Sequence, residues 1–142
     1  MYLKLLLFVA MLAAIALKEV KSISVEQVEK LAKSMRKTCL QKIDTTEDLV
    51  EGIQRGEFPE DYNLKCYTNC IMKTLRTFKN GAIDFNMLIK QVDSMMPPDM
   101  AARVKDTIQK CRTLEFTGDP CEISYKYVKC YYELDPEIFL FP

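Results

Sequence analysis

Apolar residues recur every three or four positions along most of the chain after residue 22, and this spacing is typical of one buried face of an α-helix. Six such segments follow one another, separated by turn or capping residues. The first segment starts at the capping-box sequence Ser24-Val25-Glu26-Gln27. Its predicted buried face consists of Val28, Leu31, Met35 and Cys39.

The second and third segments are also expected to be helices with polar caps. Asp44, Thr45 or Thr46 can cap the second helix, and Gly56 ends it. Asp61 is the expected cap of the third helix. The predicted inward residues are Leu49, Val50 and Ile53 in the second helix and Leu64, Tyr67, Ile71, Leu75 and Phe78 in the third. Thr74 and Thr77 are predicted to lie on or beside the third stripe, where a buried hydroxyl needs a backbone carbonyl or a ligand as its partner.

The remaining three helices lie between strong breaking signals. Lys79-Asn80-Gly81-Ala82 interrupts the pattern before Asp84 opens the fourth helix, and Met96-Pro97-Pro98-Asp99 separates the fourth from the fifth. The sixth runs from about Cys121 to Glu133. The predicted inward residues of the fourth and fifth helices are Phe85, Leu88, Ile89, Val92, Met100, Val104, Ile108 and Cys111. The pattern therefore predicts an all-α domain of six helices.

Residues 1–22 read as a secretory signal peptide that precedes this domain of residues 23–142. A short basic start is followed by an unbroken apolar run from Leu5 to Leu17, with Ala14-Ile15-Ala16 and Ser22 as candidate cleavage positions. A membrane anchor would need about 20 apolar residues, and this run is shorter. We therefore expect a secreted, extracellular protein.

Charge and composition exclude several classes of function. Without Lys4, Lys18, Lys21 and Glu19, the expected mature chain keeps 17 basic and 19 acidic residues, so neither nucleic acid nor membrane insertion is expected. The chain contains no histidine, which removes His-based acid–base chemistry, Ser-His and Cys-His nucleophiles and His-containing zinc sites. We expect neither an enzyme nor a bound cofactor or metal.

Six cysteines, all in the expected mature part, predict three disulfides in an oxidising compartment. Cys66 and Cys70 lie one helical turn apart, with side chains that do not point at each other, so each should pair with a distant cysteine. Of the fifteen pairings that six cysteines allow, twelve remain. Each bond contributes about 3–4 kcal/mol in the chain-entropy model, which would let a small domain tolerate a hollow interior.

Two groups of apolar residues exceed what a packed core obviously needs. The first is the set of methionines, whose thioether chains adapt to guests of different shape but also serve as ordinary core filler. The second is the tail Ile138-Phe139-Leu140-Phe141-Pro142, which should fold back onto the domain because an exposed aromatic end invites aggregation. The tail can be a structural plug or one wall of a cavity.

The cysteine spacing, with gaps of 26, 3, 40, 9 and 8 residues, resembles that of the insect odorant-binding proteins of the pheromone and general odorant-binding type. The sequences Cys66-Tyr67-Thr68-Asn69-Cys70 and Pro97-Pro98-Asp99-Met100, and a tail ending in aromatic-x-aromatic-Pro, resemble the LUSH-like branch of that family. The resemblance implies six helices around an internal apolar cavity that the C-terminal tail covers. It also implies the pairing Cys39–Cys70, Cys66–Cys121 and Cys111–Cys130.

The resemblance further implies a carrier of a small hydrophobic odorant, pheromone or similar volatile, such as an alcohol, an ester or a fatty-acid-like molecule. Thr77 corresponds to a threonine that contacts polar ligand heads, whereas a family serine corresponds to Met72, which favours a bulkier, more apolar guest. The other predicted ligand-binding residues are Leu75, Phe85, Met95, Met96, Ser124, Val128, Tyr131, Phe139 and Phe141.

An olfactory receptor or a second copy of the chain is a further expected partner. Two alternatives stay open: a carrier of lipids, hormones or host molecules in another body fluid, and a stapled interaction protein with a filled core.

Overall fold

The computed structural model describes residues 25–142, which form six α-helices, a two-stranded hairpin and one 3₁₀ turn. The predicted signal peptide and the first residue of the predicted capping box, Ser24, lie outside the described residues. The elements are α2 (Val25–Leu40), α3 (Glu47–Gln54), α4 (Tyr62–Thr74), β1 (Phe78–Lys79), β2 (Ala82–Ile83), α5 (Phe85–Met95), α6 (Pro98–Arg112), α7 (Pro120–Leu134) and η1 (Pro136–Ile138).

Four helices begin at a side chain that accepts a hydrogen bond from a backbone N–H of the first turn, which would otherwise lack a partner. The capping oxygens of Thr46, Asp61, Asp84 and Asp119 lie 3.3, 2.7, 3.0 and 2.8 Å from the amide nitrogens of Leu49, Leu64, Met87 and Cys121. The caps expected at residues 46, 61 and 84 are therefore confirmed.

The third helix ends earlier than its apolar stripe predicted. Arg76, with φ of 59°, lies just beyond α4 in the left-handed region. Phe78 pairs with Ile83 across an antiparallel hairpin, whose turn residues Asn80 and Gly81 have φ of 53° and 78°. Two consecutive positive φ angles are typical of the tight turn that Asn-Gly favours between strands. The placement of residues 75–78 on the third helix was therefore wrong.

Two residues that were expected to face inward are exposed. Leu31 is 45% exposed, because α2 is buried through its C-terminal half, where Met35 and Cys39 lie. Met100 is 41% exposed, and the buried face of α6 begins one residue later at Ala101. Both residues lie in the N-terminal half of their helices, where helical spacing alone does not determine which residues a neighbouring element covers.

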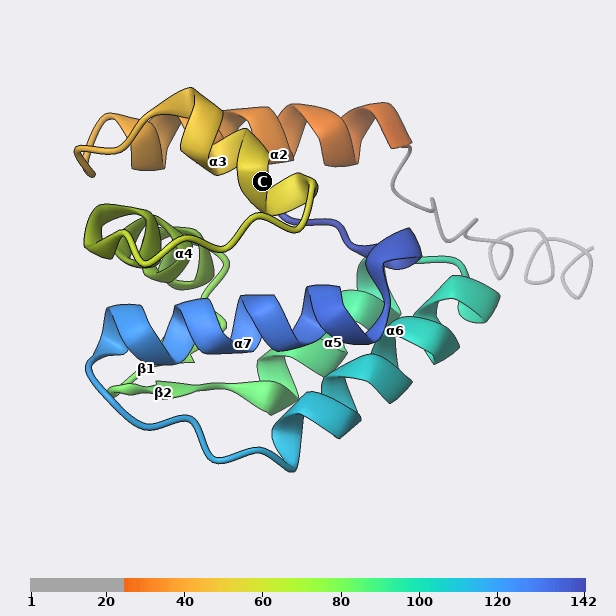
Figure 1. Cartoon of the computed structure of the whole chain (residues 1–142). Helices are drawn as coiled ribbons and strands as arrows, with labels where there is room; N and C mark the ends of the chain where they lie inside the picture. Colours follow the sequence, from red (N-terminus) through yellow and green to blue (C-terminus); the bar gives the residue numbers. More distant parts are fainter. Residues whose placement is uncertain (1–24) are drawn as a thin grey trace, which may run out of the picture.

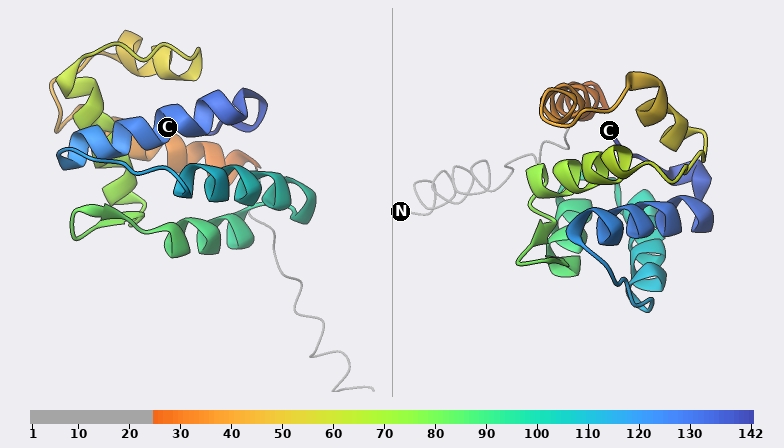
Figure 2. Two further views of the ribbon diagram at one scale, coloured as in Figure 1. Left: turned by 60° about the horizontal axis from the view of Figure 1, so that its bottom comes forward. Right: turned by 60° about the vertical axis from the view of Figure 1, so that its left-hand side comes forward.

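α4 lies between the other helices, with α2 and α3 on one side and α7 on the other (Figures 1 and 2). Its side chains Leu64, Tyr67 and Ile71 are fully buried, so the centre of the core lies along this helix. α5 and α6 pack beneath α7 in Figure 1, and the hairpin connects α4 to α5. This arrangement confirms the predicted six-helix all-α fold.

Three disulfides join the helices in the pairing that the family resemblance implied. Cys39–Cys70 ties α2 to α4, Cys66–Cys121 ties α4 to α7, and Cys111–Cys130 ties α6 to α7. All six cysteines are thus used. Among residues 25–142, none of the helices combines the length and the apolar character that crossing a membrane requires.

Candidate ligand-binding site

The apolar interior along α7 brings together several of the predicted site residues. Met72 of α4 and Val128 and Tyr131 of α7 are at most 9% exposed and belong to one contiguous cluster of buried side chains. Phe139 of the tail joins the same cluster, with its ring centroid 5.6 Å from that of Tyr131. The half-buried Phe141 stacks on Phe139, with the two centroids 6.2 Å apart. These side chains form an aromatic and aliphatic environment suited to an apolar guest.

The tail is held in place by hydrogen bonds to its backbone as well as by its aromatic rings. The Tyr131 hydroxyl donates to the Ile138 carbonyl at 3.3 Å, and the Tyr67 hydroxyl donates to the Pro142 carbonyl at 2.9 Å. Gln54 of α3 donates its amide N–H to the Phe141 carbonyl. The end of the chain therefore lies against both α3 and α4, close to the C mark in Figure 1.

The two tyrosines that bind the tail are neutral donors around neutral pH. Burial raises the pKa of Tyr131 to about 12, with a smaller contribution from the charge of Asp135. Burial likewise raises the pKa of the Tyr67 hydroxyl above its ordinary value of 10.0. Both hydroxyls accordingly keep their protons and their hydrogen bonds to the tail.

A surface ion-pair cluster fixes the point where α7 turns into the tail. The Arg103 guanidinium of α6 contacts both carboxylate oxygens of Asp135 at 2.5 Å and one oxygen of Glu137 at 2.8 Å. Asp135 is the C-cap of α7, and Glu137 lies in η1. A two-point contact between a guanidinium and a carboxylate sets orientation as well as distance, so α6 defines the direction in which the tail leaves α7.

The two predicted polar contacts, Thr77 and Ser124, are fully buried and already bonded to protein groups. The Thr77 hydroxyl donates to the Met72 carbonyl at 3.1 Å. The Ser124 oxygen accepts from the Asn69 side-chain amide at 2.8 Å, which leaves the serine hydroxyl proton for a second partner. A ligand contact from either residue stays a prediction.

The other predicted site residues are Leu75, the C-cap of α4, and three residues at the start and the end of α5. Leu75 and Phe85 are half-buried and pack against the central cluster, and the Phe85 ring meets the buried Tyr127 edge-on at 5.8 Å. Met95 and Met96 are half-buried at the last turn and C-cap of α5, and Met96 packs against the cluster. The predicted set thus falls into an inner group along α4, α7 and the tail and an outer group around α5.

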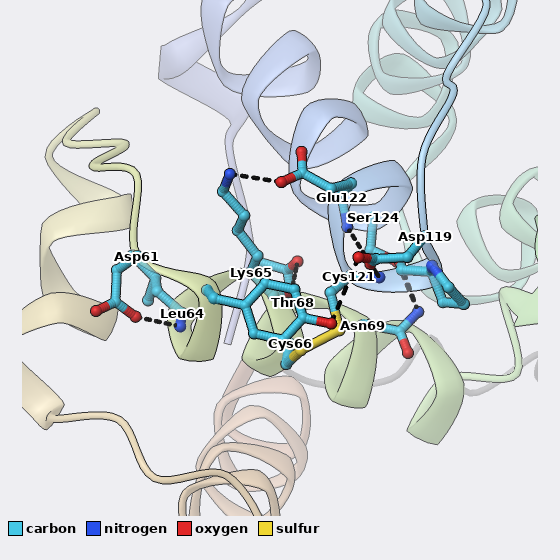
Figure 3. Close-up of a disulfide and its surroundings, with 12 residues drawn as sticks. Asp61, Leu64, Lys65, Cys66, Thr68, Asn69, Asp119, Cys121, Glu122 and Ser124 are labelled. Carbon is cyan, nitrogen blue, oxygen red and sulfur yellow. Dashed lines mark hydrogen bonds and ion pairs between the residues drawn. A yellow bond between two sulfur atoms is a disulfide. The ribbon is translucent and has the colours of Figure 1, made fainter.

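A polar network around Cys66–Cys121 was not predicted, although it fixes α4 against α7 (Figure 3). Lys65 is only 6% exposed, and its ammonium contacts Glu122 at 2.6 Å and also the Glu60 carboxylate. Those two hydrogen-bonded carboxylates raise the pKa of Lys65, and Lys65 in turn lowers the pKa of Glu60. Asn69 adds a second link, because its side-chain amide also donates to the Pro120 carbonyl at 3.1 Å.

The sequence contains one signal for this network. Lys65 and Glu122 are the immediate neighbours of Cys66 and Cys121, so a disulfide between these cysteines brings opposite charges together. The network has a structural role, since each of its charged groups has a protein partner. In residues 25–142, no group of three or more acidic or cysteine side chains is arranged to hold a metal ion.

Comparison with known proteins assigns the chain to a family. The profile of the PBP/GOBP family matches residues 21–134, which is most of the chain. The chain therefore belongs to the PBP/GOBP family, the insect pheromone- and general odorant-binding type that the cysteine spacing predicted.

Individual relatives agree with this assignment. A solved structure of Apis mellifera odorant binding protein 5 is 57% identical, covers 85% of this chain and 99% of its own, and superimposes with a TM-score of 0.82. Odorant Binding Protein 4 of Chrysopa pallens is 32% identical, covers 84% and 98%, and gives a TM-score of 0.77. General odorant-binding protein 72 of Anopheles gambiae is 28% identical over 122 residues, which are 85% of this chain and 100% of that protein. The narrower resemblance to the LUSH-like branch stays a prediction.

Proposed function

We propose that this protein is a secreted, non-enzymatic carrier that binds one small hydrophobic molecule in an internal cavity. The observation that carries the proposal is membership of the PBP/GOBP family. The three-disulfide scaffold and the aromatic tail folded against the core support it. The guest would lie among Met72, Val128 and Tyr131, with Phe139 and Phe141 as the wall that the tail supplies. The outer group around α5 would line the far side.

The chemistry of the inner group favours a guest that is mainly apolar. Burial of apolar surface supplies the affinity at roughly 25 cal/mol per Å² before ordering costs are subtracted. A guest of roughly 10 to 16 non-hydrogen atoms, at about 0.5 kcal/mol each, would bind with a Kd between about 1 μM and a few hundred micromolar. A hydroxyl, from Thr77, Ser124 or Tyr131, would orient the polar end of an alcohol, an ester or a fatty-acid-like molecule.

Displacement of a fluorescent apolar probe tests this proposal. The oxidised mature protein should bind N-phenyl-1-naphthylamine saturably, and long-chain alcohols, acids or esters should displace it. Phe141→Ala should weaken probe binding, whereas Leu140→Ala should leave it unchanged because Leu140 is 60% exposed on the same tail. Failure of the fully oxidised protein to take up the probe would indicate a filled core and an interaction protein instead.

The tail and the leader each have a separate test. Deletion of residues 137–142 should change the rates of ligand uptake and release if the tail covers the cavity, and unchanged rates would leave it a structural plug.

Expression of the full chain in insect cells should give a secreted product whose N-terminus, read by mass spectrometry, is Ile23 or the residue after Ala16. Retention of residues 1–16 on the secreted protein would contradict the assignment of a cleaved signal peptide.

A further inference from the structure

A surface cleft lies apart from the tail and has a chemistry of its own. It has a volume of about 410 Å³ and is formed by the hairpin, the first residues of α5 and the last residue of α6, which lie near the lower edge of Figure 1. This volume lies within the range of small-molecule sites in proteins. The cleft is lined by Lys79, Asn80, Ala82, Ile83, Asp84, Phe85, Asn86 and Arg112.

One positive charge in the cleft is left without a counter-ion. Lys79 and Asp84 cancel each other, since their charged groups lie 2.7 Å apart. The hydrogen bond from Lys79, followed by the one from the Met87 N–H, lowers the pKa of Asp84, so this carboxylate stays ionised. Arg112 is exposed, and its side chain forms no ion pair or hydrogen bond with any residue in the range 25–142. The cleft therefore carries a net positive charge at Arg112.

An aromatic ring lies directly beneath that charge. The guanidinium carbon of Arg112 is 5.7 Å from the centroid of the Phe85 ring, a distance at which a cation and a ring face attract each other. The Phe85 ring is itself held edge-on against the buried Tyr127 at 5.8 Å. The guanidinium therefore lies over the Phe85 ring, and Ala82 and Ile83 extend the apolar lining beside it.

We propose that this cleft is a second binding site, which takes an apolar monocarboxylate with its carboxylate on Arg112 and its aromatic or alkyl group on the apolar lining formed by Ala82, Ile83 and the part of Phe85 that Arg112 leaves uncovered. A guanidinium offers two parallel N–H donors that match the two oxygens of a carboxylate. An uncharged alcohol of the same shape can use only one of them and gains no charge attraction. The cleft opens at the surface and shares only Phe85 with the residues assigned to the proposed interior site, so ligand binding in the cleft does not require an internal cavity.

The test is a titration followed by amide NMR on the ¹⁵N-labelled mature protein, with 4-phenylbutyrate and 4-phenylbutan-1-ol as matched probes. The acid should cause saturable shifts at residues 79–86 and 112, and the alcohol should bind there at least about tenfold more weakly. Arg112→Gln should weaken binding of the acid by at least about tenfold, as expected when a charge-assisted hydrogen-bonded pair is lost. The affinity of Arg112→Lys for the acid should lie between those of the wild type and Arg112→Gln, because lysine keeps the charge and lacks the two parallel N–H donors.

Lys37→Gln is the matched control. It removes the same charge from an exposed position of α2, across α4 from the hairpin (Figure 1), and should leave binding of the acid unchanged. The same shifts should persist in Phe141→Ala, which perturbs the interior and not the cleft. Equal affinity for acid and alcohol, unchanged affinity in Arg112→Gln, or shifts confined to buried residues of α4 and α7 would overturn the proposal.

Discussion

Replacement of Phe139 by alanine should detach the tail while the six-helix core stays folded. The Phe139 ring is 7% exposed and contacts the rings of Tyr131, Tyr132 and Phe141 at centroid distances of 5.6, 5.1 and 6.2 Å. Burial of such a side chain contributes about 1.5–3 kcal/mol, and each well-placed ring pair adds about 0.5–1.5 kcal/mol. These terms sum to at least about 3 kcal/mol, and the loss expected here is about 3–5 kcal/mol, which is what buried Phe→Ala changes typically cost.

The free energy lost in Phe139→Ala is at least as large as the net free energy with which the tail docks onto the helices. Two hydrogen bonds to carbonyls of residues 139–142 contribute roughly 1 kcal/mol each, and ordering these four residues costs about 1–2 kcal/mol per residue. With Phe139 the favourable terms, about 5–7 kcal/mol, match or slightly exceed a cost of about 4–8 kcal/mol. Without Phe139 the cost exceeds what remains, so the open tail becomes the major state.

Limited proteolysis with chymotrypsin measures this opening. Cleavage after Leu140 needs an extended, accessible tail, and its rate follows the open population when opening is fast. A docked tail that is favoured by at most about 2 kcal/mol is already open a few per cent of the time, so the rate should rise by about tenfold, and by at most about thirtyfold, in Phe139→Ala before the open state saturates. Phe116→Ala is the control, because Phe116 is half-buried and contacts Tyr127 at 6.0 Å, away from the tail rings. An unchanged rate after Leu140, or equally fast cleavage throughout α4 and α7, would refute local opening of the tail.

Three further predictions concern single contacts. Tyr67→Phe removes the hydrogen bond to the Pro142 carbonyl and should weaken tail docking by about 0.5–1.5 kcal/mol. Chymotrypsin should then cleave faster after Leu140 while the melting temperature stays unchanged. A lower melting temperature would contradict this prediction. Gly56→Ala should destabilise the protein to urea by more than about 1–2 kcal/mol, because φ is +80° and the new Cβ would lie 2.5 Å from the Tyr132 ring. Gly81→Ala, with φ of +78° and open space, should show the backbone strain alone, and equal losses at both positions would argue against the clash. Asp84→Ala should lower the melting temperature at pH 7, and this difference from the wild type should vanish as the pH falls below 3.8. The pKa of the Asp84 carboxylate is lowered in the folded state, so its stabilisation is present above pH 3.8 and lost on protonation. A difference that stays constant with pH would contradict the roles of the ion pair and the cap.

Helix starts were predictable from the sequence because capping is a local interaction. Thr46, Asp61 and Asp84 each bond to an amide three residues later, so the polar residue and the apolar run that follows it contain the whole signal. The disulfide pairing was not predictable in this way. Spacing left twelve pairings, and only the family resemblance selected the one that the structure has.

The end of α4 was missed because apolar spacing continues past the helix. Leu75 and Phe78 keep the helical interval, but Arg76 adopts a left-handed conformation and Phe78 enters the hairpin. The Asn80-Gly81 pair between Phe78 and Ile83 was the signal for the hairpin. This turn signal outweighs the helical spacing of Leu75 and Phe78, which is coincidental.

The burial of Lys65 and the cleft at Arg112 could not be read from local patterns. Lys65 is buried because Cys66–Cys121 brings α7 and its Glu122 to it, and this contact spans 57 residues. Arg112 and Phe85 meet because the end of α6 lies beside the start of α5. Such contacts depend on tertiary packing, which the spacing of apolar residues does not specify.

The most direct test of the interior site is a set of intermolecular NOE contacts between ¹³C-labelled protein and bound dodecan-1-ol. An apolar alcohol avoids the charge at Arg112, so it should report on the interior alone. The account predicts contacts from the alkyl chain to the methyl groups of Met72 and Val128 and to the ring of Phe141. Contacts confined to exposed side chains, or no saturable binding by the fully oxidised protein, would contradict an internal carrier site.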